Sequence, residues 1–400
     1  MEEKPEPPLE SAPQQQQPSE PILHPLSHKL TQFYTISYLI FFAIFGTLAR
    51  LGLQALTFYP GAPVVTGVLW ANVGGSLLMG FFQEDRKLFR EEWGISSTSP
   101  DTNNSGDNDN TLERAKQHKT IKKTIPLYIG LTTGFCGCFT SFSSFIRDVF
   151  LALTNDLPNP SSSSSQGEDG IPSRNGGYSF MALVAIILST VSLSLCALLF
   201  GTHLAAALDG ITPTVPFRFT RRVLDPLMAV LGWGCWLGAV FMAIWPPDRH
   251  SVDGKEEVWR GRAVFAIVFA PLGCLLRFYL SLLLNARMPS FPLGTFTVNV
   301  FGTVVLAMCF DLQHVGSIGG NGLIGCQVLQ GVMDGFCGSA TTISTWVAEL
   351  SALGGGTAGG RKRWAAYVYG VVSVGVALGF VVVIVGSLGW TRGFDAPVCG

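Results

Sequence analysis

Two asparagines lie at matching places inside long apolar stretches of the chain. Asn72 is in WANVGGS and Asn299 is in TVNVFGT. An amide side chain offers two N–H donors and one acceptor, so each asparagine can either donate to a dehydrated anion or join two helices by a hydrogen bond. Polar groups at membrane depth are costly and are candidates for function. The sequence leaves both roles open.

A hydroxyl-rich break interrupts one apolar stretch in each half of the chain. The segments GFCGCFTSFSSF (134–145) and GFCGSATTISTW (335–346) carry their hydroxyl groups at matching positions, which are Thr140, Ser141, Ser143 and Ser144, then Thr341, Thr342, Ser344 and Thr345. Non-helical backbone at membrane depth is tolerated only where protein or a water-filled cavity covers it. If the two breaks meet, their freed carbonyl oxygens can hold a cation. The alternative is a kinked helix capped by its own hydroxyl groups.

Two arginines and one aspartate are the charged candidates. Arg50 and Arg277 match one another near the ends of apolar stretches, where they can either draw anions into a vestibule or extend toward lipid headgroups. Asp334 stands where the first half has Thr133. It is a candidate for a proton site, a cap of the break, or a charge that balances a bound cation.

Two aromatic residues and two further acids have less specific signals. Phe142 and Phe145 flank the hydroxyl groups of the first break, and aromatic ring edges carry partial positive charge that can face an anion. Packing is the usual role of phenylalanine in a membrane. Asp148 and Glu349 match one another, and we expect them near the ends of their spans, at the membrane interface.

The composition indicates a membrane protein and argues against other classes. Only 13% of the 400 residues are charged and 48% are hydrophobic, whereas soluble domains carry about 25% charged residues. The sequence has no basic stripe with interleaved aromatic residues, which nucleic-acid binding would require. It also has no nucleophile–base pair that would indicate an enzyme. Five of the nine cysteines lie in apolar runs as small buried thiols, and no C-x-x-C pair predicts a zinc or redox framework.

Nine apolar segments are near the roughly 20 residues that a bilayer requires. The predicted spans are 34–56, 63–83, 126–152, 178–203, 226–246, 262–285, 292–311, 324–350 and 364–390. The fold class is therefore all-α and integral to the membrane, with nine transmembrane helices. The first 33 residues are rich in Pro, Gln and Glu, which predicts a disordered N-terminal tail rather than a secretory signal.

The chain contains an internal repeat. FGTLARLGL pairs with LGCLLRFYL, and the same offset then brings Asn72 onto Asn299. The predicted parts are a four-helix repeat at 34–203, a basic link at 204–225, a linking helix at 226–246, a second four-helix repeat at 262–390 and a C-terminal tail at 391–400. Because four spans return the chain to its starting side, the unpaired fifth span inverts the second repeat, a common plan in transport proteins.

The distribution of basic residues predicts the orientation. With the N-terminus in the cytoplasm, most of the 26 Lys and Arg residues fall on the cytoplasmic side, as the positive-inside rule requires. This orientation places the C-terminus outside. The bias is weaker in the second repeat.

These motifs resemble those of the Fluc/CrcB family of fluoride channels, in the two-domain form of the eukaryotic fluoride exporters. GFCGCFTSFSSF is close to the family's GFCGGxTTFSTF, and GTLAR/GCLLR and GVLWANVGG/GTFTVNVFG are similar to its first-helix and second-helix motifs. The resemblance covers roughly 36–203 and 262–390. It implies a passive fluoride channel of the plasma membrane that gives fluoride resistance, and a monomer that acts as a pseudo-dimer, with fluoride and the bilayer as its partners.

The resemblance also implies the site residues. Those expected to line the fluoride pore are Asn72, Asn299, Phe142, Phe145, Ser143, Ser344, Thr295, Ile343 and Trp346, with Arg50 and Arg277 in the vestibules. A structural sodium ion is expected on the backbone carbonyl oxygens of Gly137, Thr140, Gly338 and Thr341. No other cofactor is expected.

Departures from the family pattern predict that one of two pores is degraded. Ile343 and Trp346 replace two phenylalanines, and Val68 replaces the threonine that the second repeat keeps as Thr295. The sequence does not assign which pore conducts. The alternative function is a proton-coupled exporter of small molecules that uses Asp334.

Overall fold

The computed structural model describes residues 27–59, 62, 64, 66–89, 120–158, 175–246, 263–315, 322–355, 359–395, 397 and 399. Within these residues all regular secondary structure is helical. Seven helical runs in the described part are long and apolar enough to cross a membrane: His28–Thr57, Pro126–Thr154, Gly176–Ala207, Phe217–Ile244, Phe265–Leu284, Leu293–His314 and Trp364–Arg392.

Two of the nine predicted spans are therefore not among these seven runs. The second span corresponds to a helix of 16 residues, Leu69–Glu84, and part of the sequence before it lies outside the described residues. The eighth corresponds to a broken run that carries Asp334 and Glu349. The first helix begins at His28, before the expected start at 34, and the rest of the predicted N-terminal tail lies outside the described residues.

The first half of the chain contains four helical runs. They are α1 (His28–Thr57), α2 (Leu69–Glu84), a broken third run, and α7 (Gly176–Ala207). The third run consists of α4 (Pro126–Ile129), the π-helix η2 (Gly130–Cys136), α5 (Gly137–Phe139) and α6 (Phe142–Thr154). Local sequence sets these bounds: Pro126 opens α4 at a position that suits proline, and the Asn175 side chain caps α7 by accepting from the Tyr178 N–H.

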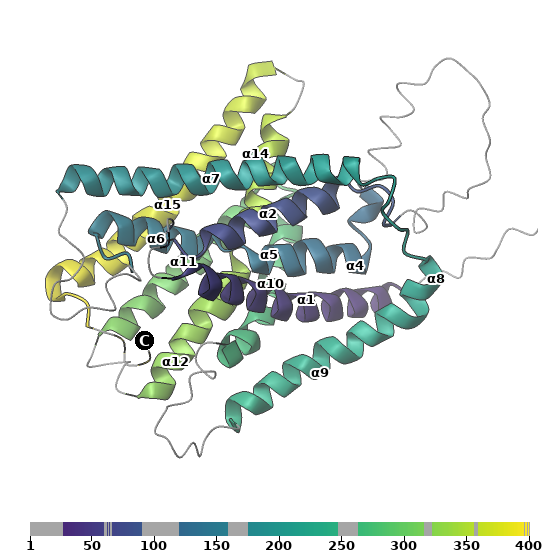
Figure 1. Ribbon diagram of the computed structural model, residues 1–400, viewed down its shortest axis with the longest axis horizontal. Helices are drawn as coiled ribbons and strands as arrows, with labels where there is room; N and C mark the ends of the chain where they lie inside the picture. Colours follow the sequence, from purple (N-terminus) through teal and green to yellow (C-terminus); the bar gives the residue numbers. More distant parts are fainter. Residues whose placement is uncertain are drawn as a thin grey trace, which may run out of the picture.

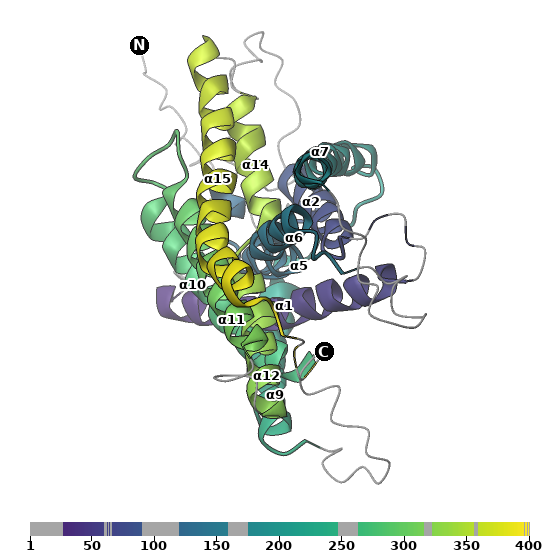
Figure 2. The same ribbon diagram turned by 90° about the vertical axis from the view of Figure 1, so that its left-hand side faces the viewer.

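The second half repeats this order. It contains α10 (Phe265–Leu284), α11 (Leu293–His314), a broken third run, and α15 (Gly359–Arg392). The third run consists of α12 (Leu323–Gly331), η6 (Val332–Cys337), α13 (Gly338–Ala340) and α14 (Ile343–Gly354). Between the halves lie the short helix α8 (Phe217–Phe219), η4 (Thr220–Leu224) and α9 (Asp225–Ile244). In both views α2 lies along α7, and α14 lies beside α15 (Figures 1 and 2).

The long helix α9 connects the two halves. Its Trp233 indole donates to the Ser37 hydroxyl of α1 at 3.1 Å, and its Trp236 indole donates to the Val268 carbonyl of α10 at 2.9 Å. The rest of α9 is largely uncovered, and Val230 is 71% exposed. Exposed aliphatic side chains on α7, α9 and α15 form the apolar surface that contact with lipid requires.

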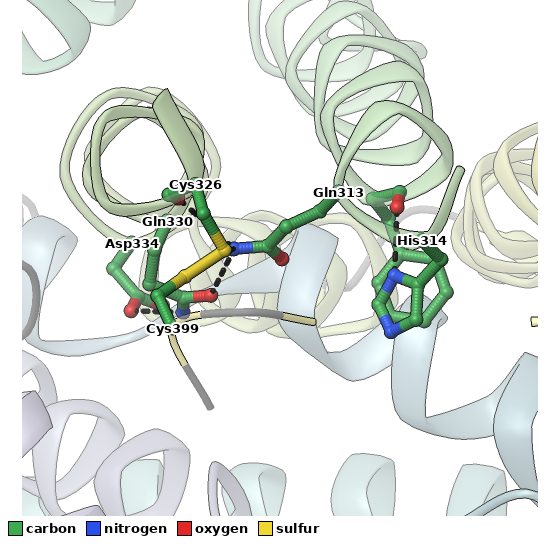
Figure 3. The surroundings of a disulfide bond; sticks show 7 residues. Gln313, His314, Cys326, Gln330, Asp334 and Cys399 are labelled. Atoms are coloured by element: carbon green, nitrogen blue, oxygen red, sulfur yellow. Dashed lines mark hydrogen bonds between the residues drawn. A yellow bond between two sulfur atoms is a disulfide. The ribbon is translucent and has the colours of Figure 1, made fainter. Parts of the chain in front are cut away.

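A disulfide bond ties the C-terminal segment to the start of α12. Cys326 is bonded to Cys399 (Figure 3), and the Asp395 N–H donates to the His314 carbonyl at the end of α11 at 3.1 Å. The sequence analysis predicted no redox framework, which is wrong for this pair. The two cysteines are 73 residues apart, so their spacing carries no signal. The five cysteines in apolar runs are free and buried, as predicted.

Candidate functional site

The two breaks lie directly against each other at the centre of the molecule. Thr140 and Ser141 are extended between α5 and α6, and Thr341 and Thr342 are extended between α13 and α14. The Thr140 and Thr342 hydroxyl oxygens are 3.0 Å apart. All four residues are fully buried. Of the two possibilities that the sequence leaves open, the structure thus shows the one in which the breaks meet.

Each break caps the helix of the opposite half. The Thr140 hydroxyl oxygen accepts from the backbone N–H groups of Ile343 and Ser344 at 3.2 and 3.1 Å. In return, the Thr341 hydroxyl oxygen accepts from the Ser143 N–H at 3.0 Å. The first N–H groups of a helix have no partner within it, so α6 and α14 each depend on a threonine of the other half.

The predicted pore serines reinforce this crossing. The Ser143 hydroxyl donates to the Cys337 carbonyl at 3.4 Å, and the Ser344 hydroxyl donates to the Cys136 carbonyl at 3.1 Å. Both bonds again join one half to the other. The two serines thus bind the Cys136 and Cys337 carbonyl groups at the ends of η2 and η6, which also accept from the backbone N–H groups of Thr140 and Thr341.

The two asparagines brace the breaks. Asn72 accepts from the Ser141 N–H at 2.9 Å and faces the Ser141 carbonyl with its amide nitrogen at 3.5 Å. Asn299 holds Thr342 in the same way, at 2.9 and 3.3 Å. Each clamp uses the side-chain oxygen and one of the two N–H donors of the amide. Both asparagines therefore form the helix-joining hydrogen bonds that were one of their two possible roles, and one amide N–H donor remains on each.

The two arginines are exchanged between the halves. Arg50 donates to the Gly338 carbonyl at 2.7 Å and also to the Asp334 carbonyl. Arg277 donates to the Thr133 carbonyl at 2.7 Å. Both side chains are buried, at 1% and 2% exposure, so neither extends toward headgroups.

Close approach of these arginines requires glycine at two positions. A Cβ atom at Gly137 would overlap the guanidinium of Arg277, and one at Gly338 would overlap that of Arg50. The glycines of both GFCG motifs therefore make room for a cation from the opposite half, in addition to permitting the break.

A cavity of about 520 Å³ opens at one end of the molecule. Its wall collects the ends of α2, α10 and α14 and the start of α4, with Arg277 and Lys123 among its basic residues. The Lys122 ammonium, also in the wall, is held by the Phe82 carbonyl at 2.8 Å. A concave site with basic walls concentrates anions.

Glu349 is held by three donors at the wall of this cavity. Thr295 donates to its carboxylate at 2.6 Å, Tyr369 at 2.7 Å and Asn285 at 3.3 Å. On α15, the Ser373 hydroxyl donates to the Tyr369 carbonyl at 2.6 Å. Three donors therefore converge on one carboxyl group at the edge of the cavity, and donors placed in this way can also serve an anion.

Aromatic residues of both halves meet beside this network. The Phe142 ring contacts that of Trp346 edge to face, with centroids 5.5 Å apart, and that of Phe145 at 5.8 Å. Ile343 is buried in the same cluster. The four predicted positions are thus brought together across the α6–α14 crossing.

Two stretches of the chain, residues 37–202 and 264–387, match the family model described as CrcB-like protein, Camphor Resistance (CrcB). The chain belongs to the CrcB-like family. It is a multi-pass membrane protein of that family.

Named relatives of this CrcB-like chain are fungal and bacterial. Fluoride export protein 1 of Neurospora crassa is 54% identical over 94% of this chain and 70% of its own length. Fluoride export protein 1 of Candida albicans is 36% identical over 88% and 79%. The fluoride-specific ion channel FluC of Pseudomonas paraeruginosa is 33% identical over 33% of this chain and 98% of its own length. No solved structure matches the chain.

The two CrcB-like halves differ at the Glu349 network. In the first half, Val68 replaces Thr295, and Asp148 stands where the second half has Glu349. Asp148 is buried and paired with Arg147 at 3.1 Å. In the first half, therefore, the Asp148 carboxylate is paired with a neighbouring arginine, and no threonine hydroxyl donates to it.

Sequence reasoning missed several residues of the CrcB-like site. It placed Glu349 at the membrane interface and did not single out Asn285, Tyr369 or Ser373. The signal for the last two was available, because a tyrosine and a serine four residues apart share one face in the apolar middle of helix α15.

The centre of the fold offers carbonyl oxygens rather than side-chain ligands for a cation. Among the described residues, no group of three or more His, Cys, Asp or Glu side chains is arranged to bind a metal. Thr140 and Thr341 end short helices in extended conformation, and their carbonyl oxygens receive no hydrogen bond recorded within the described chain. The Gly338 carbonyl, in contrast, is shared with Arg50.

Proposed function

We propose that this chain is a passive fluoride-selective channel that exports fluoride from the cytoplasm and gives fluoride resistance. It acts as a monomer with two inverted four-helix repeats joined by α9, which makes nine spans and a pseudo-dimer. The names of the relatives support fluoride as the ion. The observation that carries the proposal is the set of three donors around the half-buried carboxyl group of Glu349 at the wall of a basic cavity.

Fluoride is small and strongly hydrated, so a pore must replace its water shell with many donors of moderate strength. The hydroxyl groups of Thr295, Tyr369 and Ser373 and the free amide donor of Asn299 are such a set. The ring edges of Phe142 and Phe145 add positive edges without tight binding. The carboxylate of Glu349 occupies the place of an anion, and fluoride uses the same donors when the carboxylate turns aside.

The conducting path is the one that follows α11 and α15 of the second half. Its donors are intact, whereas the path along α2 and α7 has Val68 and the Arg147–Asp148 ion pair in the corresponding places. An arginine bound to an aspartate offers its charge to that partner rather than to a passing anion. One working pore and one degraded pore follow from this difference.

The cavity faces the cytoplasm and the disulfide faces outward. The end of α2 and the start of α4 meet the ends of α10 and α14 at the cavity, as an inverted second repeat requires. Lys122 and Lys123 at this end agree with the positive-inside rule. The Cys326–Cys399 bond belongs to the opposite side, because disulfides persist in oxidising compartments. This arrangement puts the N-terminus in the cytoplasm and the C-terminus outside the plasma membrane.

Passive flow is sufficient for export. An inside-negative membrane potential favours anion efflux by about 2.3 kcal/mol per 100 mV. Neutral HF crosses membranes and ionises in a near-neutral cytosol, so the outward leak of fluoride lowers its internal concentration without a coupling ion.

A structural sodium ion belongs at the crossing of the breaks. The Thr140 and Thr341 carbonyl oxygens would hold it, together with those of Gly137 and Gly338, and its charge would fix the two breaks together. The sharing of the Gly338 carbonyl with Arg50 makes the threonine carbonyls its principal ligands.

Efflux from liposomes tests the proposed function. Purified protein is reconstituted into vesicles loaded with potassium fluoride, and release is followed with a fluoride electrode after addition of a potassium ionophore. We expect rapid release of fluoride and little release of chloride from matched vesicles. Fluoride release no faster than from protein-free vesicles would refute the channel.

A further inference from the structure

The indole N–H of Trp346 is buried without a hydrogen-bond partner. The side chain is 1% exposed, and its Nε1 atom has no acceptor within reach. The buried N–H of a tryptophan usually finds a partner, and Trp233 and Trp236 of this chain both do so. An unpaired buried donor is costly, so a group that accepts from the Trp346 N–H would relieve that cost.

The N–H edge of Trp346 faces helix α15. A Cβ atom placed on Gly370 would lie 3.9 Å from the Trp346 Cζ2 atom, and Cζ2 and Nε1 share the same edge of the indole. Gly370 directly follows Tyr369, whose hydroxyl group binds Glu349. Glu349 is one helical turn beyond Trp346 on α14, so the two share a face.

We infer that the Trp346 N–H is a hydrogen-bond donor to the fluoride ion in transit. This inference rests on the proposed function. The indole supplies a stronger donor than the ring edge of a phenylalanine, next to the tyrosine and serine of α15. Its ring packs against that of Phe142 in a T-shaped pair, which restrains the orientation of the indole.

The matching residue of the first half is Phe145, which has no such donor. The N–H therefore exists at one of the two corresponding positions only. An anion that reaches Trp346 satisfies the orphaned donor, and the donor replaces part of the hydration shell of the anion.

The decisive variant removes only the indole N–H of Trp346. Replacing Trp346 with 3-benzothienylalanine exchanges the N–H for sulfur and keeps the bicyclic shape, so packing against Phe142 and Gly370 is retained. The same replacement at Trp236 of α9, which donates to the Val268 carbonyl of α10, is the matched control. Fluoride efflux is measured in the liposome assay, with monodispersity in detergent as the check of folding.

We expect the Trp346 replacement to lower the initial rate of fluoride efflux about tenfold and the Trp236 replacement to change it less than twofold. Wild-type rates from the folded Trp346 variant would overturn the inference and leave the proposed function intact. Failure of the wild-type protein to release fluoride would instead remove the proposed function.

A second measurement needs no folded benzothienyl variant. In protein labelled with [¹⁵N]tryptophan, the indole cross-peak of Trp346 is assigned by its loss in Trp346→Phe. We expect this peak to move on titration with sodium fluoride and not with sodium gluconate. A Trp346 peak that sodium fluoride does not move would overturn the inference, because a bound anion changes the shift of its donor.

Discussion

Replacement of Thr295 by valine is the sharpest test of the conducting path. The Thr295 hydroxyl donates to the Glu349 carboxylate at 2.6 Å and is fully buried. Valine keeps the branched shape and removes only the donor, which makes the second half like the first at Val68. Hydrogen bonds to charged groups contribute about 1.5–3 kcal/mol. Tyr369 and Asn285 remain, so the lower value applies, and about 1.4 kcal/mol corresponds to a factor of ten.

We therefore expect Thr295→Val to lower the initial rate of fluoride efflux about tenfold at equal protein per vesicle. The reverse change, Val68→Thr, is the matched control in the first half. It should leave the rate within twofold, because the Arg147–Asp148 pair still closes that path. Equal rates for Thr295→Val and wild type, or a comparable fall for Val68→Thr, would refute the assignment of the path to α11 and α15.

Three further outcomes follow from the geometry. Asp334→Asn should keep fluoride efflux within twofold of wild type, whereas abolished transport would favour the proton-coupled exporter. Gly338→Ala should displace the Arg50 guanidinium and lower the midpoint of thermal unfolding by several degrees, as loss of a charged hydrogen bond implies. The control Gly375→Ala, where a Cβ meets open space, should leave the midpoint unchanged. Equal unfolding midpoints for Gly338→Ala and wild type would contradict the close contact. Cys399→Ser should lower the unfolding midpoint, because disulfides contribute about 2–4 kcal/mol, and should leave efflux unchanged; maleimide labelling of denatured, unreduced wild-type protein at Cys326 would contradict the bond.

The sequence predicted the elements better than the contacts. Apolar length and the paired motifs identified the helices and the breaks, because bilayer thickness and glycine act locally along the chain. The meeting of the two breaks followed from the repeat. The partner of Asn72 did not, because an amide in an apolar helix can serve a ligand or the backbone of a neighbour equally well.

Long-range contacts account for what was missed. Arg50 sits near the end of its helix in sequence, and only the fold carries it into the opposite half. Glu349 resembles an interfacial acid until Thr295 and Tyr369, from two other helices, surround it. The partner of Cys326 lies close to the C-terminus, and no local pattern joins two such positions.

The reciprocal capping by Thr140 and Thr341 has a consequence for biogenesis. The ribosome makes residue 140 about two hundred residues before residue 341. The first broken helix therefore enters the membrane with the Ser144 N–H of α6 capped by Ser141, but before Thr341 can accept from the Ser143 N–H. The centre of the protein can close only after the second break has been inserted and oriented. Translation order thus makes the ion path one of the last parts of the molecule to form, and a chain that stops between the halves would leave unpaired backbone groups in the lipid.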